Sequence, residues 1–414
     1  MNRRDALLLG ATATALGSLL PSSLLAAASG SLRKMTDDVK PIGRDEFLAR
    51  IDKARELMGR HGIGALLIEP GASMVYFTGV EWRRSERLTA IVIPREGEIA
   101  IVTPFFEAPS VAETLAVPAE LRTWNEDEDP LAAVAAILRD RKVTAPVGIE
   151  ETVRYFAIDA LMRVMPEVQI MSGAAIVRGC RMVKSPGELK LLQKAADITI
   201  AAYRYVAPRI QRGMTPKDIG AMMDAAHLAL GAQPEFALIL LGEASAYPHG
   251  SGKPQAVREG EIVLMDCGCT LHGYQSDISR TFVFGEASAE QRKVWQQVRQ
   301  GQQIAIETAR VGVAAGAVDD AVRAQYGKWG YGPGYQLPGT PHRTGHGIGL
   351  DGHEPVNLVH GETTPLARGM CFSNEPGIYL PGRFGIRLED CFHMGEKEPV
   401  WFSKPPDSLD KPFG

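Results

Sequence analysis

The feature that most constrains this chain is a carboxylate placed inside an apolar segment. Asp266 follows the apolar residues 262–265 and precedes Cys267 and Gly268, a run that predicts a buried strand. An isolated charge is very costly to bury, so Asp266 requires a partner inside the fold. Because alternate strand residues share a face, we expect Cys267 and Cys269 to point away from Asp266.

A second carboxylate follows at a spacing that suits a paired strand. Asp277 lies eleven residues after Asp266, and residues 270–273 between them are typical of a hairpin turn. Two paired strands would place both carboxylates side by side on one face. Two close carboxylates repel each other, and a divalent cation between them removes the repulsion.

Three later segments carry the same kind of residue in apolar or glycine-rich surroundings. The segment PHRTGHGIGLDGHEP holds His342, His346 and His353, three of only nine histidines, while Glu375 and Glu389 each end an apolar stretch. The glycines lack the order and the βαβ setting of a dinucleotide loop, and an arginine stands where a zincin has its catalytic glutamate. Taken singly, each glutamate is typical of a salt-bridged or solvated residue. The order Asp, Asp, His, Glu, Glu is far more specific.

The chain is long enough for two domains, and its pattern predicts an α/β (α+β) fold. Residues 44–61 have helical spacing that ends at Gly62, and strands are expected at 65–68, 88–94 and 98–103. Ser185, Pro186 and Glu188 form the signature of a capped helix start, with the helix reaching about residue 208. We place the boundary near 175–185, with a first domain at 31–180 and a second at 181–414.

The N-terminus predicts export. Arg3 and Arg4 precede an apolar run over residues 6–20, and small residues at 26–28 suit a signal peptidase, so residues 1–30 resemble a twin-arginine signal. We expect the twin-arginine machinery to deliver the protein to the periplasm. An uncleaved membrane anchor is the alternative interpretation, because no charge occurs from residue 6 to 31. The apolar run is, however, shorter than the ~20 residues of a spanning helix.

Charge and cysteine content argue against nucleic-acid binding and against a disulfide-stabilised fold. The formal net charge is −4 and no long Lys/Arg block occurs, so nucleic acid is not an expected partner. The five cysteines form no CxxC pair and predict no disulfide framework.

Together the motifs MDCG, SDISRTF, HRTGHGIGLDGHEP, NEPGIY and GIRLED resemble those of the pita-bread metallopeptidase family. That family includes Xaa-Pro dipeptidase (prolidase), aminopeptidase P, methionine aminopeptidase and creatinase. The resemblance implies a creatinase-like N-terminal domain followed by a pita-bread catalytic domain with two metals. Methionine aminopeptidase typically lacks the first domain.

Carried over residue by residue, the resemblance implies five metal ligands. Asp277 and Glu389 would bridge two divalent ions, Asp266 would complete one, and His346 with Glu375 the other. Carboxylates and one imidazole favour Mn²⁺, with Zn²⁺, Co²⁺ or Fe²⁺ as alternatives. A hydroxide shared by the metals would be the nucleophile, and Glu375 would shuttle its proton.

The resemblance also places three histidines on the substrate side. His249, His353 and His342 would donate hydrogen bonds to the scissile carbonyl and its oxyanion, with a purely structural role as the alternative for each. Arg387, two residues before Glu389, either steadies that carboxylate or forms an ordinary salt bridge.

The implied activity is hydrolysis of Xaa-Pro bonds, which lack an N–H and carry a bulky ring. Short proline-containing peptides are the expected partners, and a homodimer or higher homo-oligomer the expected assembly. The compact ligand spacing, 29 residues from His346 to Glu375 and 14 to Glu389, favours a dipeptidase. An Xaa-Pro aminopeptidase, a creatinase-like or non-catalytic binding protein, and another metal-dependent reaction such as a lyase remain alternatives. Arg343, Arg383 and Arg387 are candidates to meet a substrate carboxylate, with residues 382–384 as a loop near the entrance.

Overall fold

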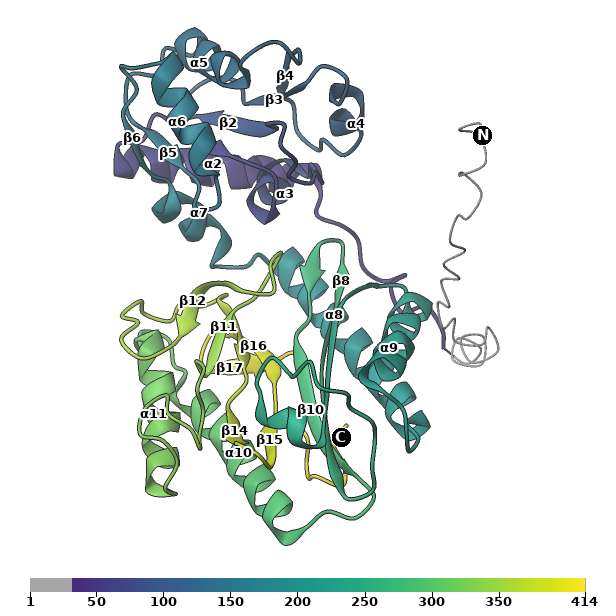
Figure 1. The fold of residues 1–414 in the computed structure, drawn as a ribbon. Coiled ribbons are helices and arrows are strands. Elements are labelled where there is room, and N and C mark those ends of the chain that lie inside the picture. The colour runs from purple at the N-terminus through teal and green to yellow at the C-terminus, as the bar shows by residue number, and fades with distance from the viewer. Residues whose placement is uncertain (1–31, 414) are drawn as a thin grey trace, which may run out of the picture.

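The computed structural model describes residues 32–413 of the 414-residue chain, which form two lobes (Figure 1). The predicted export signal, residues 1–30, lies outside the described residues. Within 32–413, every helix is too short or too polar to cross a membrane. The α/β fold class is confirmed, with helices and strands mixed through both lobes.

The first lobe is a six-stranded sheet with helices on its two faces (Figure 1). Its strand order is β4-β3-β2-β1-β5-β6, and β2 runs antiparallel to both its neighbours while the other pairs are parallel. The elements are α2 (Arg44–His61), β1 (Ala65–Ile68), α3 (Ala72–Thr78), β2 (Ala90–Pro94), β3 (Ala100–Pro104), α4 (Ala108–Glu113), β4 (Glu120–Trp124), α5 (Pro130–Asp140), β5 (Val147–Ile149), α6 (Tyr155–Val164), β6 (Ile170–Ser172) and α7 (Ala174–Arg181).

The local sequence explains these elements. Helix α2 spans the predicted residues and ends at Gly62, whose φ of 68° is the left-handed conformation that glycine adopts without steric cost. Strands β1, β2 and β3 are buried throughout, because alternate side chains enter one core on each face of the sheet.

The second lobe contains two larger sheets and a hairpin, with α8, α9, α10 and α11 outside them. One sheet has the order β10-β8-β7, with β9 paired to β8; another has the order β12-β11-β13-β16-β17; the hairpin is β14-β15. The elements are α8 (Pro186–Val206), η1 (Ala207–Arg209), α9 (Pro216–Leu230), β7 (Gln233–Leu241), η2 (Gly242–Ala246), β8 (Glu261–Leu271), β9 (Tyr274–Gln275), β10 (Ile278–Phe284), α10 (Ala289–Thr308), α11 (Ala315–Lys328), β11 (Gly345–Gly347), β12 (Glu354–Leu358), β13 (Cys371–Asn374), β14 (Gly377–Leu380), β15 (Phe384–Arg387), β16 (Asp390–Met394) and β17 (Pro399–Trp401).

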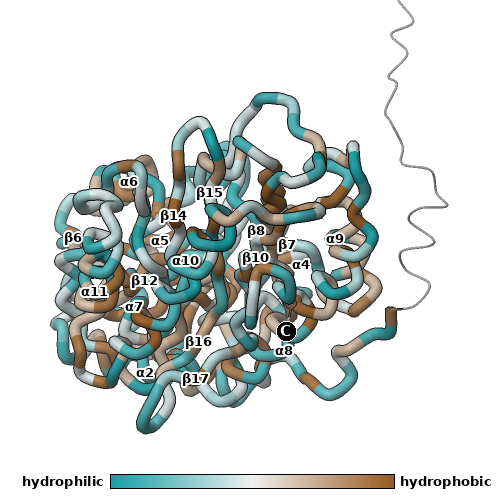
Figure 2. The backbone as a smooth tube through the Cα atoms, turned by 90° about the horizontal axis from the view of Figure 1, so that it is seen from below, coloured by the Kyte–Doolittle hydropathy of each residue, from teal (hydrophilic) through white to brown (hydrophobic). Residues whose placement is uncertain are grey.

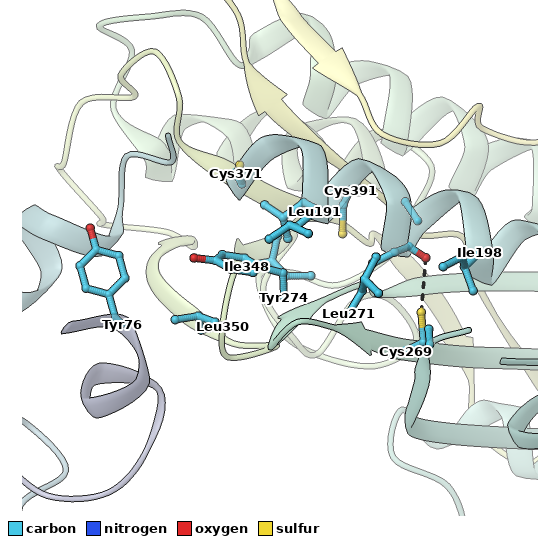
Figure 3. Packing of buried hydrophobic residues seen from close by; sticks show 14 of the residues in the cluster. Tyr76, Leu191, Ile198, Cys269, Leu271, Tyr274, Ile348, Leu350, Cys371 and Cys391 are labelled. Carbon is cyan, nitrogen blue, oxygen red and sulfur yellow. Dashed lines mark hydrogen bonds between the residues drawn. The ribbon is translucent and has the colours of Figure 1, made fainter. Parts of the chain in front are cut away.

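The predicted pairing around Asp266 is confirmed. The chain turns at His272 and Gly273, both with positive φ, and β10 returns beside β8 so that Ser279 pairs with Asp266. Asp277 therefore lies one residue before β10, near Asp266. Cys267 and Cys269 are buried on the other face of β8, where Cys269 donates to the Ala195 carbonyl of α8 (Figure 3).

One hydrophobic cluster continues from the first lobe into the second. It contains Tyr76 of α3 and Tyr274 of β9, and Figure 2 shows the hydrophobic segments along β7 and β8 that extend it. Arg50 of α2 crosses the boundary: its guanidinium donates to the Tyr274 hydroxyl at 2.8 Å and lies 3.4 Å from Glu188 of α8. The predicted cap of α8 is confirmed, because Ser185 and Glu188 bond each other's backbone N–H.

Candidate metal centre

Five side chains from distant parts of the sequence meet in the second lobe. Asp266 lies on β8, Asp277 immediately before β10, His346 on β11, Glu375 immediately after β13, and Glu389 between β15 and β16. These are the five positions predicted as metal ligands. Each sits on or beside a buried strand, so the two sheets and the hairpin fix their positions.

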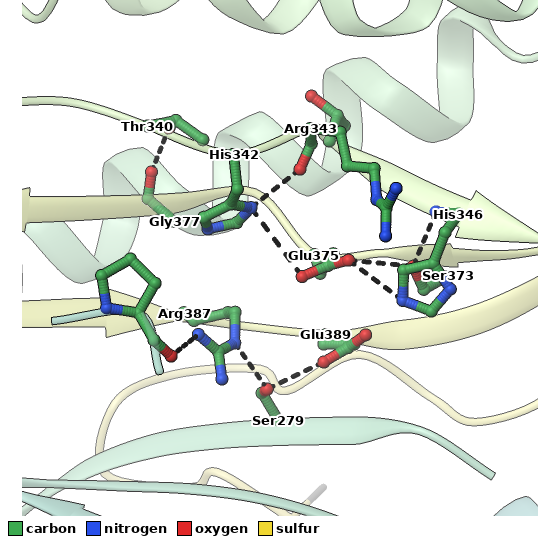
Figure 4. Close-up of polar contacts among 12 residues, drawn as sticks. Ser279, Thr340, His342, Arg343, His346, Ser373, Glu375, Gly377, Arg387 and Glu389 are labelled. Atoms are coloured by element: carbon green, nitrogen blue, oxygen red, sulfur yellow. Dashed lines mark hydrogen bonds and ion pairs between the residues drawn. The ribbon is translucent and has the colours of Figure 1, made fainter. Parts of the chain in front are cut away.

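The five groups approach closely enough to share cations. The ligand atoms of Asp266, Asp277 and Glu389 lie within 4.8 Å of one another, as do those of His346, Glu375 and Glu389. His346 Nε2 is 3.2 Å from Glu375 Oε1 (Figure 4). The same nitrogen is 3.6 Å from Asp277 Oδ2. Asp277, His346 and Glu389 each belong to two of the three such groups found among the described residues.

The tautomer of His346 suits this arrangement. Its Nδ1 lies 3.0 Å from the Gly347 carbonyl, which can only accept, so Nδ1 carries the proton. Nε2 is then left with a free lone pair directed at Asp277 and Glu375. A second protein group that fixes the tautomer is typical of metal-binding histidines.

The electrostatics of the cluster favour the binding of positive charge. Burial and then the neighbouring carboxylates raise the pKa values of Asp277 and Glu389 well above their usual range. Buried oxygens Asp266 Oδ1 and Glu389 Oε1 have no hydrogen-bond partner among the described residues. Burial opposes ionisation of Glu375, yet a hydrogen bond from His346, when that ring is protonated on both nitrogens, and then the charges of His346, His342 and Arg387 hold the pKa of Glu375 below the usual value. A cluster of four carboxylates, two of which have an oxygen without a hydrogen-bond partner, therefore fits divalent cations.

Of the two expectations for Arg387, the structure shows the salt bridge, which is made with Asp266, and a link to Glu389 only through Ser279. Its Nη2 donates to Asp266 Oδ2 at 2.6 Å, and its Nε donates to the Ser279 hydroxyl, which in turn donates to Glu389 at 2.8 Å (Figure 4). The sequence interpretation missed Ser279, which directly follows the SDI segment. Its contribution depends on the pairing of β8 with β10.

The three predicted substrate-side histidines line the same cavity but differ in their contacts. His249 is exposed at the cavity wall. The ring of His353 lies 3.9 Å from that of His346, and its Nδ1 accepts from Arg343 at 3.1 Å, which leaves the proton on Nε2. Burial, His346 and Arg343 lower the pKa of His353 to about 4, so the ring is neutral at pH 7.

His342 is fully engaged by the protein. Its Nδ1 donates to the Arg343 carbonyl at 2.8 Å, and its Nε2 accepts from the Tyr379 hydroxyl at 2.8 Å. Tyr379 also accepts from Arg387 at 2.9 Å. The structure therefore gives His342 the contacts of a positioning residue. Tyr379, which the sequence interpretation left without a role, connects His342 to the arginine beside Asp266.

Glu354 was also given no role from the sequence. It is buried, binds Lys184 at 2.8 Å and Arg181 at 2.6 Å, and accepts the backbone N–H of Leu350. Burial opposes its charge, but Lys184 and Arg181 lower its pKa to about 2. Glu354 thus ties the loop that carries His353 to the segment between the lobes. Its signal was available, since it is a carboxylate beside His353 in the same glycine-rich segment.

A cavity of about 650 Å³ opens onto the five side chains. Its volume falls in the range of small-ligand sites. The cavity is also lined by aromatic and aliphatic side chains: Phe236, Leu238, Tyr335, Pro341 and Val359. Arg383 does not line it; this residue pairs with Glu290 of α10 at the turn of β14-β15. A loop near the entrance at residues 382–384 stays a prediction.

Comparison with known proteins gives two family matches in series. Residues 50–183 match the creatinase/prolidase N-terminal domain, and residues 190–396 match metallopeptidase family M24. The chain is 33% identical over 368 residues to the probable dipeptidase PepE of Mycobacterium tuberculosis, covering 88% of this chain and 96% of the relative. It is 32% identical over 354 residues to an Xaa-Pro dipeptidase of Lactobacillus helveticus, covering 82% and 93%.

The solved structure of dipeptidase PepE from Mycobacterium ulcerans superimposes with a TM-score of 0.81 at 30% identity, over 89% of this chain and 99% of that one. The predicted creatinase-like domain and pita-bread catalytic domain are thus both present. On the combined evidence of site, sequence and structure, this chain belongs to metallopeptidase family M24 and is a metallopeptidase.

Proposed function

We propose that this protein is a metal-dependent Xaa-Pro dipeptidase. The observation that carries the proposal is the convergence of Asp266, Asp277, His346, Glu375 and Glu389 in one cavity. The complete set of five speaks against a non-catalytic binding protein on this fold. The relatives named as dipeptidase and Xaa-Pro dipeptidase support the choice of reaction.

The five side chains would hold two divalent cations, with Mn²⁺ favoured by the oxygen-rich donor set. Such cations polarise a carbonyl and acidify a water at neutral pH. The unpartnered oxygens of Asp266 and Glu389 are the atoms that gain most from a cation.

The protein's own groups complete the chemistry. Glu375 is ionised and faces the cavity, so it can take a proton from the attacking water and pass it to the leaving proline nitrogen. His353, neutral and protonated at Nε2, can donate to the oxygen of the scissile carbonyl. His249, exposed at the cavity wall, is a second donor that substrate can reach. Arg387 holds Asp266 in place, and His342 with Tyr379 holds Arg387.

The cavity also suits a proline ring. Phe236, Leu238 and Val359 offer apolar surface beside the metal ligands. A tertiary amide needs no acceptor for an N–H, so apolar walls around the proline leave no buried polar group unpaired.

The test uses purified protein stripped of metal by a chelator and reconstituted with Mn²⁺ or Co²⁺. We expect Ala-Pro to be cleaved only after reconstitution, and Ala-Ala to be a much poorer substrate. Full cleavage by rigorously metal-free protein, or equal cleavage of the two dipeptides, would contradict the proposal.

A second candidate is an Xaa-Pro aminopeptidase that acts on longer peptides. A neighbouring cavity of about 900 Å³, between α9 and residues 249–255, shares His249 and Phe236 with the first. That space would accommodate chain beyond the proline. Comparing Ala-Pro with Ala-Pro-Ala separates the two candidates.

A further inference from the structure

The three arginines that the sequence offers as carboxylate anchors have different environments. Arg383 pairs with Glu290 and does not line the catalytic cavity. Arg387 does line it, but its guanidinium is buried and bonded to Asp266. Arg343 lines the cavity and has no carboxylate within ion-pairing distance among residues 32–413.

Arg343 is also held in a defined place. Its Nη2 donates to His353 Nδ1 at 3.1 Å, and its backbone carbonyl accepts from His342. The side chain extends from the segment before β11 toward the space near His346 and Glu375 (Figure 4). Its remaining guanidinium N–H groups are not among the buried atoms without partners, so they are open to the cavity or solvent.

The covalent structure of the substrate requires an anchor at this place. In an Xaa-Pro dipeptide, only the proline nitrogen and α-carbon separate the scissile carbonyl from the free carboxylate. A carboxylate anchor must therefore lie beside the group that binds the scissile carbonyl. His353 is the donor proposed for that carbonyl, and Arg343 is bonded directly to its Nδ1.

We infer that Arg343 binds the free α-carboxylate of the substrate and makes dipeptides the preferred substrate class. This inference rests on the proposed Xaa-Pro activity and extends it. A planar guanidinium matches a carboxylate with two parallel N–H···O bonds, which an amide or a longer chain cannot reproduce. Arg343 would donate one hydrogen bond to His353 and others to the substrate carboxylate. These bonds would hold His353 and the substrate in a fixed relative position.

The experiment compares Ala-Pro with its C-terminal amide, Ala-Pro-NH₂, in Mn²⁺-loaded protein. The wild type should prefer the free acid, and Arg343→Gln should reduce the ratio of the two kcat/KM values by about 10- to 100-fold, the effect of a charge-assisted hydrogen bond. The loss should appear mainly in KM for Ala-Pro. Arg343→Lys should recover part of the ratio, because it keeps the charge but not the planar fork.

Arg383→Gln is the matched control, since Arg383 is an arginine of the same lobe that pairs with Glu290 and does not line the cavity; it should keep the wild-type ratio. If Arg343→Gln lowers both substrates equally, Arg343 only positions His353 and the inference is wrong. If the wild type cleaves the acid and the amide equally well, the inference is also wrong while the Xaa-Pro activity stands. If the wild type cleaves neither substrate with metal, the proposed function itself fails.

Discussion

Replacing Glu354 by glutamine should destabilise the catalytic lobe and displace His353. The carboxylate is buried between Lys184 and Arg181 and also accepts backbone N–H groups of its own loop. Burial opposes the charge of Glu354, but Lys184 and Arg181 lower its pKa from 4.5 to about 2, a shift that corresponds to about 3 kcal/mol of folding stability at neutral pH. The Glu354→Gln substitution would leave two buried cations facing a neutral amide.

The size of the effect can be checked by thermal unfolding. For a lobe of this size we expect the Tm of Glu354→Gln to fall by about 6–12 °C. Activity should fall by about 10- to 100-fold, because the loop no longer holds His353 beside His346. Asp351→Asn is the control: its carboxylate also meets Arg181 but is half exposed, so its cost should stay below about 1 kcal/mol.

The pH dependence follows from the same shift. Because the folded-state pKa of Glu354 lies below the unfolded value, its contribution is complete above about pH 4.5 and is lost as the pH falls toward 2. The Tm difference between wild type and Glu354→Gln should therefore shrink over that range. Equal Tm values for Glu354→Gln and Asp351→Asn at pH 7 would refute the reasoning.

Three further predictions concern the metal ligands, export and substrate length. Asp277→Asn and Glu389→Gln should each lower kcat/KM for Ala-Pro by at least about 1,000-fold, or ~4 kcal/mol, since each removes a ligand proposed for both cations; steady-state assays at saturating Mn²⁺ check this, and a loss below tenfold would contradict the bridging role. Replacing Arg3 and Arg4 by lysine should leave uncleaved precursor in the cytoplasm, as fractionation and immunoblotting would show; normal export would reject the twin-arginine route. Ala-Pro should be cleaved with higher kcat/KM than Ala-Pro-Ala, and the reverse order would favour the aminopeptidase.

Much of the site could be predicted because its residues break local rules. Asp266 stands in an apolar strand and His346 in a glycine-rich segment, and both patterns are visible without any tertiary information. Helix α8 and the turn at His272 and Gly273 were predictable for a similar reason, since caps and turns are chosen by residues within a few positions.

The remaining features depend on contacts between distant segments. Glu354 meets Lys184 across 170 positions, and no local pattern shows that pairing. The sequence alone also could not show which arginine is available to bind a substrate carboxylate, because Arg387 reaches Asp266 only through the packing of β15 against β8. Arg343 differs from them in what surrounds it, which only the fold reveals.

The most direct test of the two-metal account is the number of Mn²⁺ ions bound per chain, measured by titration calorimetry and elemental analysis on metal-stripped protein. The account predicts two ions for the wild type, with Ala-Pro cleavage rising as they bind, and loss of both sites in Asp277→Asn. Glu375→Gln should weaken one site more than the other, because Glu375 is proposed to serve a single cation. Full Ala-Pro cleavage by protein that binds no Mn²⁺, or unchanged binding of two ions by Asp277→Asn, would contradict the account.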